Sequence, residues 1–123
     1  MTKEKIRRVL KRLPYIRKLI EEEKTEALIY INHNTEKFEI DEEVKIIVEI
    51  IAEIIAHEPQ GSWLATVLKY IQDGQKDVSI IIKSPVSRAK YYIVKEQVVE
   101  KIYECCIYKG LVSYEDILNE IIG

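Results

Sequence analysis

The sequence has few residues of the kind that form disulfide frameworks. Its two cysteines, Cys105 and Cys106, are adjacent, and neighbouring side chains on a helix point about 100° apart. A structural disulfide between them is not expected, because the bond requires side chains that face each other. Reduced thiols are typical of a reducing compartment, and we predict a cytoplasmic protein.

The sequence also lacks the usual signatures of metal and phosphate sites. Neither His33 nor His57 has a second histidine or a cysteine at the spacing of zinc ligands, so no metal site is expected. The four glycines are scattered and form no glycine-rich phosphate loop. Solvation, helix dipoles and nearby cations explain most of the carboxylates. We therefore predict that the protein is not an enzyme and has no cofactor.

Long apolar runs are absent. The longest spans residues 27–31, whereas a membrane helix needs about 20 apolar residues. Residues 1–20 are basic, but charges interrupt them every two or three positions, so they lack the apolar core of a signal peptide. We predict a soluble protein with no membrane partner.

Charge is unevenly distributed, although the net charge at pH 7 is only −2. Residues 1–24 carry nine cations and four anions, and residues 59–101 carry seven and four. Residues 25–58 carry two cations and nine anions, and residues 102–123 carry one and four. The excess of cations in residues 1–24 favours contact with an acidic surface, which is either DNA or the acidic segment of a second copy.

Hydrophobic periodicity predicts helices through most of the chain. The predicted fold class is therefore all-α, a helical domain with a C-terminal helix-turn-helix. Pro14 should lie in the first turn of a second helix, spanning 14–28, with a kink at Pro14 as the alternative. Residues 25–34 suit either a helix or a strand. We divide the chain into residues 1–58 and 59–123 and expect them to form one compact unit.

The clearest predicted helix spans residues 41–57. Asp41 is its expected N-cap, and the helix should end before Pro59. Its valine and isoleucines recur at spacings of three and four, which makes a wide apolar stripe. We interpret this helix as the core of the domain, with a homodimer helix as the alternative.

Residues 75–103 have the layout of a helix-turn-helix, with a short helix, a tight turn and a longer helix that begins with small and basic residues. The first turns of a recognition helix carry the side chains that reach base edges and phosphates. Candidate DNA-binding residues here are Lys83, Ser84, Ser87, Arg88, Lys90, Tyr92 and Lys95. Either serine can instead cap the helix. The inward face should be Tyr91, Val94, Val98 and Ile102.

The basic N-terminal region adds a second group of candidates. Eight cations stand against one anion in residues 1–20, which is more than solubility requires. The candidate phosphate-binding residues of this region are Arg7, Arg8, Lys11 and Arg12.

The segment VSIIIKSPVSRAKYYIVKEQVVEKI resembles the C-terminal helix-turn-helix of small phage transcriptional regulators of the ArpU/RinA type, which is related to sigma-factor region 4. Residues 86–92, VSRAKYY, stand where these proteins have Ile-Ser-Arg-Ser-Thr-x-Tyr. LPYIRKLIEEE is similar to their opening, Tyr-x-Tyr-Leu-Lys-x-Glu-Ile-Glu-Glu. Departures are Ile81, in place of a small residue, and Ser84–Pro85 in the turn. The resemblance implies a phage- or prophage-encoded transcription regulator that binds double-stranded DNA, with RNA polymerase as a further candidate partner.

A second hypothesis remains open. Residues 84–109 are then an ordinary amphipathic helix, and the chain is a non-enzymatic interaction or phage assembly factor that oligomerises through the isoleucine-rich helix 41–57. Salt dependence separates the two hypotheses, because phosphate contacts weaken steeply with salt and apolar association does not.

Overall fold

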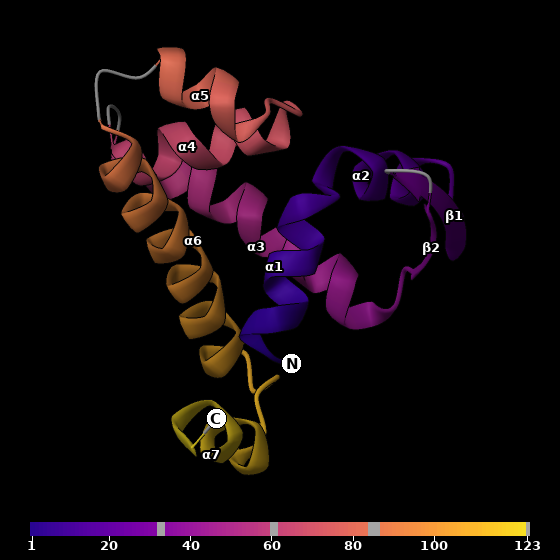
Figure 1. The fold of residues 1–123 in the computed structure, drawn as a ribbon. Helices are drawn as coiled ribbons and strands as arrows, with labels where there is room; N and C mark the ends of the chain where they lie inside the picture. Colours follow the sequence, from indigo (N-terminus) through magenta and orange to yellow (C-terminus); the bar gives the residue numbers. More distant parts are fainter. Residues whose placement is uncertain (32–33, 60–61, 84–86, 123) are drawn as a thin grey trace.

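The computed structural model describes residues 1–31, 34–59, 62–83 and 87–122, and it is predominantly helical, as predicted (Figure 1). Its elements in chain order are α1 (Lys3–Lys11), α2 (Leu13–Glu21), β1 (Glu26–Ile31), β2 (Asn34–Glu39), α3 (Glu42–His57), α4 (Trp63–Gln72), α5 (Asp77–Lys83), α6 (Arg88–Tyr108) and α7 (Tyr114–Ile122).

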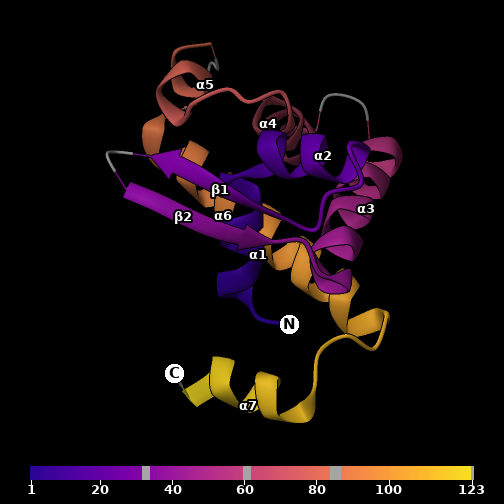
Figure 2. The same cartoon turned by 90° about the vertical axis from the view of Figure 1, so that its right-hand side faces the viewer.

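Four helices, α1, α2, α4 and α6, pack against α3. The longest helix, α6, runs along one side, with α4 and α5 near its beginning and α1 beside its later turns (Figure 1). The two strands lie on the other side of α1, in front of α1 and α6 when the molecule is turned by 90° (Figure 2). The last helix, α7, lies beyond the end of α6, where the Met1 ammonium is 3.1 Å from the Asp116 carboxylate.

Two helices begin where the sequence predicts them, and two others end before glycines. Asp41 begins α3, and its Oδ1 accepts a hydrogen bond from the Val44 amide at 2.9 Å. Pro14 lies in the first turn of α2, where its missing N–H costs nothing. α4 and α6 end before Gly74 and Gly110, whose φ angles of +83° and +73° are left-handed and free of strain only for glycine.

The predicted second helix is too long. It was expected to reach residue 28, but α2 ends at Glu21. The chain turns at Glu23, whose φ of +56° is left-handed, and the Lys24 amide donates to the Leu19 carbonyl at 2.9 Å. This is the helix-ending pattern that glycine usually provides, and without a glycine the sequence does not signal it.

The segment after this turn, for which helix and strand were both open, is a strand. β1 pairs with β2 in an antiparallel two-stranded sheet, in a register that runs from Glu26 opposite Glu39 to Ile31 opposite Asn34. The hairpin is therefore an addition to the predicted all-α fold. It is attached to the helices through Phe38 of β2, whose side chain is buried in the common core.

The buried apolar side chains form one cluster, to which residues before and after position 58 both contribute. The predicted inward face of α6 is confirmed, since Tyr91, Val94, Val98 and Ile102 are all buried. The stripe of α3 is also buried, at Val44, Ile47, Ile50, Ile51 and Ile54. The isoleucine-rich helix therefore packs inside this chain as its core helix, and these five side chains are not available to a second copy.

Candidate nucleic-acid interface

The short helix α5 is followed by the long helix α6, in the order that was predicted from the sequence. α5 ends at Lys83 and α6 begins at Arg88, while the predicted site residue Ser84 lies outside the described residues. Ser87 is the N-cap of α6, because its Oγ accepts a hydrogen bond from the Lys90 amide at 3.2 Å. Of the two roles considered for Ser87, the structure shows the cap.

A carboxylate at the start of α5 attaches α5 to α6. Oδ1 of Asp77 accepts a hydrogen bond from the Tyr91 hydroxyl at 2.5 Å, and both Asp77 oxygens accept from Lys95 Nζ, at 3.0 and 3.1 Å. Burial opposes ionisation of Asp77, but the two partners outweigh it and hold the pKa of this carboxyl below its usual value. Burial and the carboxylate both raise the pKa of the Tyr91 phenol, so the phenol stays protonated and can donate.

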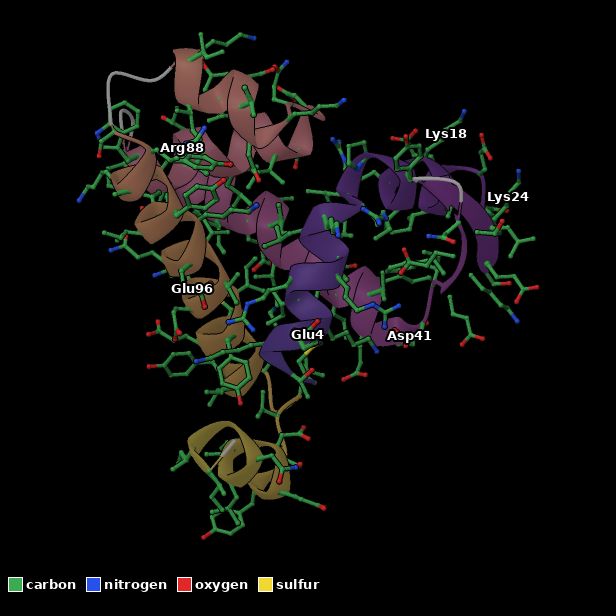
Figure 3. The ribbon with its side chains drawn as sticks, viewed as in Figure 1. Glu4, Lys18, Lys24, Asp41, Arg88 and Glu96 are labelled. Atoms are coloured by element: carbon green, nitrogen blue, oxygen red, sulfur yellow. The ribbon has the colours of Figure 1, made fainter. Side chains whose placement is uncertain are left out.

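The first turn of α6 is exposed to solvent. Arg88 and Lys90 are both exposed, and no ion pair between described residues involves either side chain. Figure 3 shows Arg88 at the beginning of α6, on the opposite side of the view from Lys18 and Lys24. Because neither cation has a carboxylate partner, both are available to bind a phosphate or a base edge.

Two other predicted lysines have partners within the chain. Lys83 Nζ donates to Gln75 Oε1 at 3.1 Å, and Lys95 pairs with Asp77 as described above. Lys95 therefore connects α6 with α5, and its charge is balanced before any ligand binds. Lys83 is exposed and has no carboxylate partner among the described residues.

The predicted residues of α6 do not all share one face. Successive residues of a helix are about 100° apart, which places Arg88, Tyr92 and Lys95 on one face and Lys90 on another. Tyr92 is 47% exposed. Its ring packs edge-on against the ring of Tyr91, with 5.2 Å between centroids, so a buried neighbour holds it in place.

The predicted N-terminal arginines hold elements of the fold together. Arg7 Nη2 lies 2.6 Å from Glu96 Oε1 of α6. Arg8 and Arg12 both reach the carboxylate of Glu36 on β2, each at 3.3 Å. The hydrogen bond from Arg8, with Arg12 beside it, keeps the pKa of Glu36 below its usual value despite slight desolvation. Lys11 is exposed and has no ion-pair partner among the described residues.

A groove brings the two predicted basic regions together. It lies between the end of α1, the start of α2, the α4–α5 connection and α6, and its volume is about 860 Å³. Arg7, Lys11 and Arg12 line one wall, and Tyr92 and Lys95 line the other. Arg88 and Lys90 do not line it, so the groove and the first turn of α6 are separate cationic surfaces.

Sequence reasoning missed the acidic partners of these cations. Three carboxylates accept hydrogen bonds from predicted DNA-binding side chains, namely Asp77, Glu36 and Glu96. The partners are 18 to 89 residues apart in the sequence. No local spacing rule covers such separations, so the sequence carries no signal for them. One further cation of the groove lining, Lys76, lies at the start of the short helix predicted for residues 76–82 but was not among the predicted site residues.

No three histidine, cysteine, aspartate or glutamate side chains gather into a metal-binding group in the described parts of the chain. Within the same residues, no helix is both long and apolar enough to cross a membrane. No family model, no curated protein and no solved structure matches this chain.

Proposed function

We propose that the protein is a DNA-binding transcription regulator that reads duplex DNA with the first turns of α6. The observation that carries the proposal is the pair of exposed cations, Arg88 and Lys90, at the start of a helix that follows a short helix and a brief connection. A helix of this kind enters the major groove by its N-terminal turns, where arginine pairs with guanine edges and lysine with phosphates.

Two further observations support this function. Asp77 attaches α5 to α6 through Tyr91 and Lys95, and a recognition helix needs such an attachment to hold its base-contacting side chains in position. The resemblance of residues 86–92 to the ArpU/RinA type points to the same helix, and it makes a phage- or prophage-encoded regulator the preferred biological setting. RNA polymerase is then a second partner to test.

The test begins with a selection of bound duplexes from random DNA at two salt concentrations. We expect enrichment of a sequence whose binding weakens steeply as salt rises, because bound phosphates release counterions. Arg88→Ala combined with Lys90→Ala should weaken binding to the selected duplex by on the order of 100-fold, given the usual worth of base and phosphate contacts. The melting temperature should not change, since both side chains are exposed.

A matched control removes the same amount of charge elsewhere. Lys18 and Lys101 are exposed, and no ion pair between described residues involves them. Lys101 is on the same face of α6 as Lys90, three turns further along. Lys18→Ala with Lys101→Ala should bind the selected duplex nearly as well as the wild type. Failure to enrich any duplex, or equal losses in the two double variants, would refute the proposed function.

A second candidate function is protein–protein interaction, and one observation favours it. On α7 the side chains of Tyr114, Ile121 and Ile122 are 76%, 75% and 81% exposed. Because the apolar stripe of α3 is buried, an interaction role would use α7 instead of the helix 41–57. Association through α7 should persist at high salt, so sedimentation at both salt concentrations separates it from DNA binding.

A further inference from the structure

The groove between α1 and α6 has more positive than negative charge. Five of its lining side chains are cations and two are carboxylates. Three cations are already paired: Arg7 with Glu96, Lys95 with Asp77, and Arg12 with Glu36 outside the groove. The remaining cations of the lining, Lys11 and Lys76, are exposed.

Lys11 and Lys76 belong to two different parts of the chain that line the groove. Lys11 is the last residue of α1, and Lys76 stands just before α5. Neither takes part in an ion pair between described residues. An anion in the groove could therefore bind two positive side chains from different elements without displacing an existing carboxylate. This arrangement favours a ligand with a phosphate.

Two tyrosines give the groove aromatic surface as well. Tyr15 of α2 is 56% exposed and Tyr92 of α6 is 47% exposed, and both line the groove. Exposed rings of this kind are used by nucleic-acid-binding proteins as platforms on which bases stack, next to cations that follow the phosphates. Pro14 and Val99 add apolar surface to the same lining, which suits a flat ring more than a simple anion.

The size of the groove limits what can enter it. Its volume of about 860 Å³ is within the range of roughly 300–1,000 Å³ that is typical of small-ligand sites. A duplex, whose major groove is itself about 12 Å wide, is too large for it. One or two nucleotides with unpaired bases are small enough to enter the groove.

We propose that this groove binds a nucleotide with an unpaired base, its phosphate held by Lys11 and Lys76 and its base stacked on Tyr15 or Tyr92. The shared chemistry is a phosphate beside a planar ring, which a free nucleotide or a single DNA strand can supply. The site is separate from Arg88 and Lys90, so this proposal does not rest on duplex recognition and can fail or succeed without it.

The test measures binding of a labelled short oligothymidylate by fluorescence anisotropy at several salt concentrations. Lys11→Ala with Lys76→Ala should weaken binding at least about 10-fold, and should reduce the slope of log affinity against log salt by about 1.4, since each phosphate contact on a single strand contributes about 0.7. Tyr15→Leu with Tyr92→Leu should weaken binding by about 10- to 100-fold but leave that slope unchanged, because stacking releases no counterions.

Competitors and a control make each outcome decisive. Unlabelled thymidine monophosphate should displace the probe better than inorganic phosphate, and its strength relative to unlabelled oligothymidylate tells a free nucleotide from a strand. Lys18→Ala with Lys101→Ala, which matches the charge change outside the groove, should bind like the wild type. Circular dichroism checks that every variant is folded. The proposal is wrong if the wild type does not bind the probe, if phosphate competes as well as the nucleotide, or if the groove variants bind like the control.

Discussion

The contact between Asp77 and Tyr91 should make a measurable and separable contribution to stability. Asp77→Ala removes three stabilising effects together, namely the hydrogen bond from Tyr91, the ion pair with Lys95 and a favourable charge in the first turn of α5. Tyr91→Phe removes only the hydroxyl. The difference between single and double variants in a double-mutant cycle isolates the one contact that both changes share.

The expected magnitudes follow from the burial of each group. A hydrogen bond to a charged acceptor contributes about 1.5–3 kcal/mol when it is buried, but the Asp77 side chain is 39% exposed, so we discount the Tyr91 contact to about 1 kcal/mol. The ion pair with Lys95 and the helix dipole add roughly 0.5 kcal/mol each. Asp77→Ala should therefore cost about 2 kcal/mol, Tyr91→Phe about 1 kcal/mol, and the double variant no more than Asp77→Ala alone.

The assay is urea unfolding followed by far-ultraviolet circular dichroism at neutral pH. As a control, Asp73→Ala changes an exposed carboxylate at the end of α4, and its effect should simply add to that of Tyr91→Phe. A coupling energy between Asp77 and Tyr91 below about 0.3 kcal/mol, which is the usual error of additivity, would refute the reasoning.

The same contact predicts a dependence on pH with a definite sign. The pKa of Asp77 is lower in the folded protein than in the unfolded chain, so the unfolded state binds the proton more readily. The contribution of Asp77 is therefore complete above about pH 4, the unfolded pKa, and is lost as the pH falls through the folded pKa. The stability difference between the wild type and Asp77→Ala should shrink over that acidic range and stay constant from pH 5 to pH 8, roughly.

Three turns allow further predictions by the same unfolding assay. Gly74→Ala should destabilise the protein by about 2 kcal/mol, because φ is +83° and the new Cβ would lie 3.3 Å from Pro14 Cγ. Gly110→Ala should cost only the backbone strain of about 1 kcal/mol, because φ is +73° and no atom lies within 4 Å of the Cβ position. Equal costs would contradict a tight contact with Pro14. Glu23→Gly should stabilise the protein by about 0.5 kcal/mol, since it relieves a left-handed φ of +56° at the end of α2; a loss of stability there would mean that the Glu23 side chain has a role of its own.

Local signals explain which elements could be predicted from the sequence. Some residues start or end a helix through contacts within a few residues of themselves: Asp41 as a cap, Pro14 in a first turn, and Gly74 and Gly110 after helix ends. Signals of this local kind can be recognised in the sequence alone. The apolar face of α6 was predictable for the same reason, because its spacing is set by the helix itself.

For residues 25–34 the sequence left helix and strand both open, and the pairing of the hairpin was not predictable, because its determinants are weak or distant. Glu23 ends α2 in a left-handed conformation that non-glycine residues seldom adopt, so the helical pattern continues past the real end. The strands are then attached to α1 by Phe38 in the core and by Glu36 between Arg8 and Arg12. Each of these contacts depends on the tertiary fold, and the candidate groove depends on it in the same way.

The distribution of charge shows why counting cations overestimates a DNA interface. The excess of cations in residues 1–24 pointed to an acidic surface, either DNA or the acidic segment of a second copy. In the folded chain much of that surface is supplied internally: Lys5 lies 2.7 Å from Asp41 and 2.8 Å from Glu43.

Ion pairing of this kind divides the predicted DNA-binding cations into two groups, those with a carboxylate partner and those without one. Arg7, Arg8, Arg12 and Lys95 are matched by carboxylates of the same chain. A phosphate would have to compete with each of those carboxylates, so its net gain there is small. Lys11, Lys83, Arg88 and Lys90 have no carboxylate partner among the described residues. If DNA binds through charge, its salt dependence should reflect about four of the eight predicted DNA-binding cations. A much steeper slope would mean that the internal ion pairs open when DNA binds.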